Sequence, residues 1–142
     1  MFGGEREQMR RLFFEAWRKH RIGEVMQPLE AMIVGVVLAH PEYHGLLDDP
    51  ENALSRDYFP EAGESNPFLH MAMHISLLEQ ISTDRPPGIG EIHRRLGQRL
   101  GEAHEAEHRM MECLGRLLWE AQAGGGMPDE RAYLDCLQRL LG

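Results

Sequence analysis

The sequence predicts an all-α protein, and three observations lead to this fold class. Apolar residues recur three and four positions apart along most of the chain, which is the spacing of one helix face. Prolines stand at the starts of several of these patterns, and a run of three glycines follows the longest one. No run of alternating apolar and polar residues argues convincingly for strands. We therefore expect a four-helix-bundle-like single domain over residues 1–142, with an additional helix and a long irregular connection.

The first two predicted helices differ in their surroundings. A helix over about residues 5–20 has an apolar stripe beside a basic side, which is typical of a helix packed on one face. The next helix begins at Pro28, which suits a first helical position, and ends at His40 because Pro41 stops it. This second helix is apolar nearly all round, so we expect it to be central and buried. Its β-branched pairs leave a buried strand as the alternative.

The rest of the chain alternates between turn-forming segments and helical patterns. Residues 41–67 are rich in proline, glycine, aspartate and asparagine, which predicts an irregular connection with short helical turns. A tight connector containing Pro86 and Pro87 separates the two longest remaining patterns. Helices are expected at about residues 42–47, 51–56, 67–83, 89–122 and 128–140, the fourth of these as one long, continuous helix.

Composition and charge narrow the class of protein. The chain has 142 residues, of which 42% are hydrophobic, and this length suits one domain with its own core. The longest apolar stretch, residues 31–39, is well short of the roughly 20 residues that a membrane span needs, and the start shows no export signal. The net charge of −8, from 15 basic and 23 acidic residues, argues against general nucleic-acid binding. Cys113 and Cys136 lack metal or redox spacing, so we expect two unpaired thiols in the cytoplasm.

Eight histidines are the unusual feature of the composition. Two imidazoles four residues apart lie about 40° apart around a helix and one turn along it, so they can bind one metal ion together. His20 and His93 have no partner at this spacing, and we expect them to be structural or surface residues. The other six form three such pairs: His40 and His44, His70 and His74, and His104 and His108.

The directions of these pairs indicate where a metal ion would bind. His70 and His74 fall in the middle of the apolar stripe of their helix, and the pair at 104 and 108 falls at the inner edge of the next one. With the two helices antiparallel about the proline connector, both pairs lie at nearly the same height. Buried imidazoles need hydrogen bonds or a metal, and Glu30 and Glu107 are carboxylates among apolar neighbours that also need partners. The predicted metal ligands are His70, His74, His104, His108, His44, His40, Glu30 and Glu107.

The predicted ligand types limit the cofactor and its chemistry. Imidazoles with one or two carboxylates suit Zn, Fe, Ni or Mn, so we expect a divalent transition-metal ion. One ion with an open position would suit a metal-dependent enzyme, and two ions would suit an iron- or oxygen-handling module. Residues 104–108 also fit the zinc-protease patterns H-E-x-x-H and H-x-x-E-H, with Glu105 or Glu107 as the general base. The absence of a predicted sheet to line a substrate cleft argues against a protease, and no catalytic residue can be assigned.

Several segments together resemble a known family. They are residues 14–20, residues 40–44, residues 66–70 with His74, residues 86–89 and residues 104–113. These segments are similar to the bacterial domain-of-unknown-function 1841 family, and the likeness covers nearly the whole chain. The resemblance implies a small bacterial cytoplasmic protein and brings no established activity. The spacing of the histidines on helices also resembles that of hemerythrin-like and DinB-like metal-binding bundles.

A non-enzymatic adaptor is the competing functional hypothesis. Residues 5–22 carry six basic and three acidic side chains, and residues 23–66 carry one basic and nine acidic ones. This polarity predicts a protein partner that docks on the basic first helix or on the acidic segment of residues 48–64, although exposed helical charge is also common as a solvated face. In this hypothesis the buried histidines form a structural polar network in the core and bind no metal.

Overall fold

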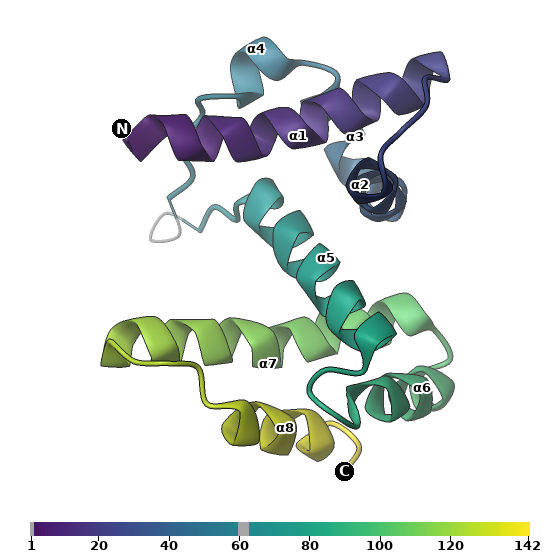
Figure 1. The fold of residues 1–142 in the computed structure, drawn as a ribbon, viewed down its shortest axis with the longest axis vertical. Helices are drawn as coiled ribbons and strands as arrows, with labels where there is room; N and C mark the ends of the chain where they lie inside the picture. Colours follow the sequence, from purple (N-terminus) through teal and green to yellow (C-terminus); the bar gives the residue numbers. More distant parts are fainter. Residues whose placement is uncertain (1, 60–62) are drawn as a thin grey trace. The chain divides into compact units, whose positions relative to one another are not determined.

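The computed structural model describes residues 2–59 and 63–142, and it confirms the all-α class. The structure is 75% helical, and the described residues include no strand. The helices divide between two compact units, residues 1–72 and 73–142, with the boundary inside α5 (Pro67–Thr83), so the single domain stays a prediction. Residues 60–62 of the expected acidic segment lie outside the described residues. The other elements in Figure 1 are α1 (Phe2–Ile22), α2 (Pro28–Leu38), the 3₁₀ turn η1 (Pro41–Tyr43), α3 (His44–Leu47), α4 (Pro50–Ala53), α6 (Ile89–Leu100), α7 (Ala103–Gly124) and α8 (Glu130–Arg139).

In the first unit, α1 packs against α2 and against α3. The β-branched pairs of α2 fall within a helix, and they form its buried face. The apolar residues Leu29, Met32 and Leu38 are exposed, so the expectation that α2 is buried all round is wrong. The helix buries one face against its neighbours, and scattered apolar residues remain on the other, as on most protein surfaces.

A buried arginine joins α1 to the irregular connection of the first unit. The Nη1 of Arg10 donates to three backbone carbonyls at 2.7–3.2 Å, those of residues 53, 54 and 56. A buried cation is costly unless its donors are satisfied, and these carbonyls satisfy Nη1, whereas the buried Nε of Arg10 has no hydrogen-bond partner among the described residues. Arg6 also pairs with Asp57 at 2.5 Å. The basic side of α1 therefore contacts the acidic segment of the same unit.

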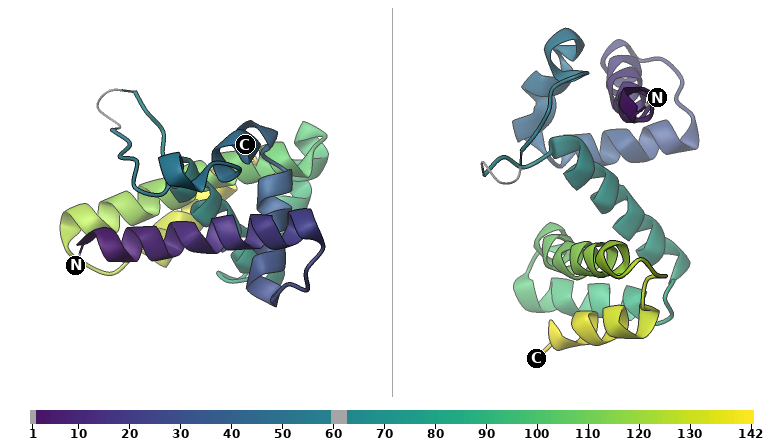
Figure 2. Two further views of the ribbon diagram at one scale, coloured as in Figure 1. Left: turned by 90° about the horizontal axis from the view of Figure 1, so that it is seen from above. Right: turned by 90° about the vertical axis from the view of Figure 1, so that its left-hand side faces the viewer.

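In the second unit, α6, α7 and α8 pack on one another, and the last part of α5 joins their core. The expected single helix over residues 89–122 is wrong, because the chain turns at Gly101. Gly101 ends α6 with a φ of +83°, a left-handed conformation that favours glycine, and its N–H bonds to the carbonyl of Gly97 at 2.8 Å. Glu102 is extended, and α7 starts directly after it. Figures 1 and 2 show the result, in which α6 lies across α7 instead of continuing into it.

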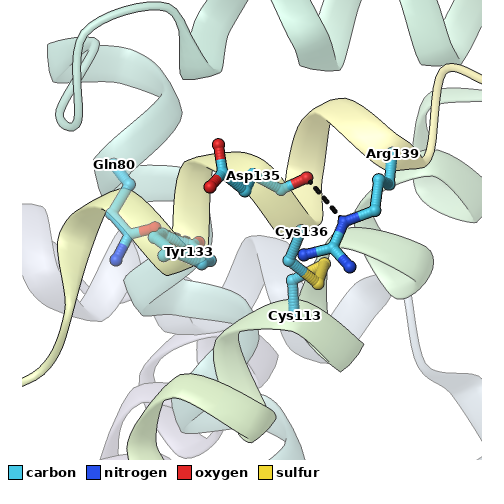
Figure 3. Close-up of a disulfide and its surroundings, with 6 residues drawn as sticks. All are labelled: Gln80, Cys113, Tyr133, Asp135, Cys136 and Arg139. Atoms are coloured by element: carbon cyan, nitrogen blue, oxygen red, sulfur yellow. Dashed lines mark hydrogen bonds between the residues drawn. A yellow bond between two sulfur atoms is a disulfide. The ribbon is translucent and has the colours of Figure 1, made fainter.

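The two cysteines correct another expectation. Cys113 on α7 and Cys136 on α8 form a disulfide (Figure 3), so the prediction of two unpaired thiols is wrong. Their Cα atoms lie 5.8 Å apart because α8 packs back onto α7 after the glycine-rich turn. The cytoplasmic location loses the support that unpaired thiols gave it. Every helix in the described part of the chain is too short or too polar to span a bilayer.

Candidate metal centre

Three histidines gather with one buried glutamate in the second unit. His74, on the part of α5 that joins this unit, is 1% exposed. His104, Glu107 and His108 lie in the first turns of α7, which starts after the turn at Gly101. Side chains three and four residues apart share one side of a helix. The first turns of α7 therefore present two imidazoles and a carboxylate together.

Glu107 lies at the middle of the hydrogen bonding in this group. Its Oε1 accepts a hydrogen bond from Nε2 of His74 at 2.7 Å, and its Oε2 accepts one from Nε2 of His93, on α6, at 2.9 Å. Burial opposes the charged form of Glu107, but the hydrogen bonds from the two imidazoles outweigh burial and hold the pKa of Glu107 below its ordinary value. Glu107 is therefore an ionised carboxylate at neutral pH, ready to accept hydrogen bonds or to bind a cation.

The potential ligand atoms of this group lie close together. One ligand atom each from His74, His104 and Glu107 fall within 4.8 Å of one another. The ring centre of His108 is 5.6 Å from that of His74 and 4.1 Å from that of His104. Two ligands of one tetrahedral zinc ion are about 3.3 Å apart, so modest side-chain shifts would close the group on an ion. The structure thus brings four of the predicted ligands together, and metal binding by them stays a prediction.

Glu107 has two chemical roles open to it in this arrangement. As a ligand, its carboxylate would complete a set of two imidazoles and one oxygen, with His74 and His104. As an acceptor, it fixes the orientation of His74 and His93, as carboxylates commonly do for metal-bound histidines. Both roles require the ionised form that the hydrogen bonds stabilise.

In the first unit, His40 and His70 form a pair of their own. Their Nε2 atoms are 3.1 Å apart. His40 is buried, and its Nδ1 donates to the carbonyl oxygen of Val36 at 2.8 Å. Because a carbonyl oxygen can only accept, the proton of the neutral His40 ring is on Nδ1, and the Nε2 that faces His70 carries the lone pair. An imidazole held in this tautomer has the form that binds metal ions.

His44 and Glu30 are engaged elsewhere in the first unit. His44 follows the break at Pro41 and donates from Nε2 to a backbone carbonyl of α2 at 2.8 Å. Glu30 accepts the backbone N–H of Gln27 at 2.8 Å and pairs with Lys19 at 3.0 Å, and these two contacts, in that order, lower its pKa. Among the described residues, no group of three or more potential ligands includes either side chain. The structure does not bring these two predicted ligands to a metal centre.

The zinc-protease interpretation of residues 104–108 finds no support in the geometry. Glu105, the general base of the forward pattern, is 49% exposed and pairs with Arg109 at 3.4 Å. Its carboxylate therefore lies on the solvent side of α7. Glu107, the base of the reversed pattern, is bonded to two imidazoles.

His93 is the residue of this group that sequence reasoning missed. It was expected to be a structural or surface residue, and a hydrogen bond to a carboxylate is such a structural role; what the sequence did not indicate is that this carboxylate is the central one of the group. A signal was present in the sequence, because His93 follows Ile89 by four residues and precedes Leu96 by three. Both of these residues are buried, so the position of His93 lies at the edge of the inner face of α6.

The comparisons with known proteins agree with the sequence resemblance. A family model described as a domain of unknown function, DUF1841, matches residues 5–139. The chain belongs to the DUF1841 family. No curated protein and no solved structure matches this DUF1841 chain, so its likeness to hemerythrin-like and DinB-like bundles is not shown. A function for this member of DUF1841 therefore has to be argued from its own residues.

Proposed function

We propose that this chain binds a divalent transition-metal ion through His74, His104 and Glu107 of the second unit. The observation that carries the proposal is the distance between their ligand atoms, all within 4.8 Å of one another. Two imidazoles and one carboxylate are a donor set that suits Zn, Fe, Ni or Mn. His108 lies beside the group as a further imidazole.

A centre with these ligands could support catalysis as well as metal binding. Catalytic zinc ions are typically held by three protein ligands, among them sets of two histidines and one glutamate, and keep a position for water. An ion held by His74, His104 and Glu107 would supply Lewis acidity to a bound water or substrate oxygen. We therefore infer a metal-binding protein whose centre suits a metal-dependent enzyme or an iron- or oxygen-handling module.

The metal content of the purified protein tests the proposal. The chain, expressed without a histidine tag, is stripped with chelator, reloaded with Co²⁺ or Zn²⁺ and desalted. We expect about one equivalent of metal per chain, with the visible absorption of a low-coordinate Co²⁺ site. His104→Ala should lose most of this metal. His20→Ala, which removes an exposed imidazole of α1, is the matched control and should keep it. A wild-type protein that stays metal-free, or equal losses in both variants, contradicts the proposal.

The pair of the first unit is proposed as a further pair of metal ligands. The distance of 3.1 Å between the Nε2 atoms of His40 and His70 supports this, as does the tautomer that Val36 fixes. A pair of two ligands would hold an ion more weakly than the centre of the second unit and would lose it on desalting. In an equilibrium titration with excess Co²⁺ and no desalting step, His40→Ala should therefore lack the weaker binding beyond one equivalent that His20→Ala keeps. Equal binding in the two variants would make the pair a structural hydrogen bond.

A non-enzymatic adaptor with a structural polar network remains the second candidate function. The observation that favours it is that Glu107 already accepts one hydrogen bond on each oxygen, from His74 and His93. The melting temperature with and without chelator distinguishes the two functions. A ligand that binds the folded state raises stability, so chelation of a resident ion should lower the melting temperature. An unchanged melting temperature in a metal-free preparation favours the adaptor.

A further inference from the structure

The disulfide between α7 and α8 lies beside charged side chains that take no part in the proposed metal centre. Each cysteine is followed three residues later by an arginine, Arg116 after Cys113 and Arg139 after Cys136. Residues three apart on a helix are neighbours on one side of it, so each sulfur shares a helix face with a guanidinium group. Arg139 donates from Nε to the carbonyl oxygen of Asp135 at 3.2 Å, and Figure 3 shows its guanidinium turned toward the sulfur atoms.

The disulfide also forms part of the wall of a small surface cavity. This cavity has a volume of about 140 Å³, and both cysteines line it together with Arg116, Arg139 and Glu120. The charged groups in its wall are therefore net positive. Cys113 is 3% exposed, whereas Cys136 is partly exposed. Reactive cysteines lie in electropositive, partly accessible places, and inert structural ones are buried. The surroundings of Cys136 are of the reactive kind.

We propose that Cys113 and Cys136 form a thiol–disulfide exchange site that accepts electrons from a dithiol. One thiolate of the dithiol attacks the sulfur of Cys136, the S–S bond of the protein breaks, and its electron pair leaves on the sulfur of Cys113. The second thiolate then attacks its partner sulfur in the mixed disulfide, forms the S–S bond of the oxidised dithiol and expels the sulfur of Cys136. Two electrons pass to the protein, and the two protons of the dithiol end on the thiols of Cys113 and Cys136. Arg116 stabilises the charge on the departing sulfur of Cys113.

Opening of the disulfide leaves other contacts that hold α8 in place. Tyr133 and Leu137 of α8 are buried in the core of the second unit, and the hydroxyl of Tyr133 donates to Gln80 at 2.6 Å. Asp129 accepts the backbone N–H of Ala132 at 3.1 Å and caps the start of the helix. An exchange site needs a fold that survives both redox states, and these contacts provide it. Such a pair also agrees with the cytoplasmic location expected from the sequence, because cytosolic disulfides are typically transient and redox-active.

Reduction of the native protein tests the proposal. The full chain, without denaturant, is incubated with millimolar dithiothreitol, quenched with iodoacetamide and weighed by mass spectrometry. We expect both cysteines to be alkylated within minutes while the circular dichroism spectrum stays helical. Replacement of the reductant by oxidised glutathione should close the disulfide again. A disulfide that opens only when urea unfolds the protein would overturn the proposal and make the bond a permanent cross-link.

Variants test the assigned roles of the side chains. Arg116→Gln should slow reduction of the native protein about threefold, because it removes the charge that stabilises the departing sulfur. Arg109→Gln removes a solvent-facing arginine of the same helix and should leave the rate unchanged. Cys113→Ala leaves the partly exposed thiol and should react quickly with a disulfide reagent, whereas Cys136→Ala leaves the buried thiol and should react slowly. Equal rates in the two arginine variants, or a faster thiol at position 113, would overturn the proposed direction of attack.

Discussion

Replacement of Glu107 by glutamine should destabilise the metal-free protein by about 2 kcal/mol. The carboxylate accepts one hydrogen bond on each oxygen, from His74 at 2.7 Å and from His93 at 2.9 Å. A glutamine of the same shape keeps one acceptor oxygen and turns its NH₂ group toward the other imidazole. One charge-assisted hydrogen bond is lost, and such a bond contributes about 1.5–3 kcal/mol. The side chain of Glu107 is only 12% exposed, so water screens these bonds little.

Urea unfolding in the presence of chelator measures this loss, and thermal unfolding should show a fall of about 4–8 °C. Glu105→Gln is the matched control, because Glu105 lies on the same helix in an exposed ion pair with Arg109. Exposed pairs contribute about 0–1 kcal/mol, so the control should stay close to the wild type. If Glu107→Gln and Glu105→Gln unfold at the same urea concentration, Glu107 is not the centre of a hydrogen-bonded group.

The pH dependence of the same variant follows from the direction of the pKa shift. The pKa of Glu107 is lower in the folded protein than its ordinary value. Its carboxylate therefore contributes stability above the pKa of an unfolded glutamate, about 4.3, and this contribution is lost as the pH falls through the lower folded value. The stability difference between wild type and Glu107→Gln should therefore shrink as the pH falls below about 4. A difference that persists in acid would assign the effect to packing.

Three further outcomes can be checked with the same methods. Gly101→Ala should lower the free energy of unfolding in urea by about 1–2 kcal/mol, because an alanine is strained at a φ of +83° even though its Cβ would have open space. Gly35→Ala is the control, because Gly35 has open space and an ordinary φ within α2, and this variant should not be destabilised. Glu30→Gln should lower stability through its lost ion pair with Lys19 and leave the metal content unchanged, and a loss of metal would make Glu30 a ligand. Metal affinity, measured by Co²⁺ titration, should fall as the pH drops through about 6.5, because imidazole binds metal in its neutral form. An affinity that does not change with pH would exclude histidine ligands.

Most helices of this protein could be predicted because their signals are local. The proline at the start of α2 and the asparagine-proline start of α5 set helix boundaries without any tertiary contact. The division at Gly101 could not be predicted in this way, because the pattern of residues 89–122 continues through the glycine as it would in one helix. After the left-handed turn, α6 packs on α7, and this contact has no counterpart in the local pattern. The disulfide was missed for a similar reason, since a separation of 23 residues carries no signal until α8 packs onto α7.

The candidate site likewise has residues whose proximity could be predicted from local spacing and one whose position could not. His104, Glu107 and His108 could be predicted as neighbours, because their spacing sets one helix side in any tertiary fold. His93 could not, since on one continuous helix it would lie roughly 21 Å along the axis from Glu107. The turn at Gly101 reduces this separation to a hydrogen bond of 2.9 Å. The argument from matched heights also assumed the continuous helix, so it does not hold in this structure.

The short chain distance between these side chains has a consequence for folding. The segment from His93 to His108 holds three imidazoles and Glu107, so bringing them together closes only a short loop and costs little chain entropy. Contacts this local form early, before distant parts of a chain meet. The same proximity lets a metal ion bind the unfolded chain as well as the folded one. An ion with affinity for both states stabilises the fold by less than its binding free energy, because part of that energy is already gained before folding.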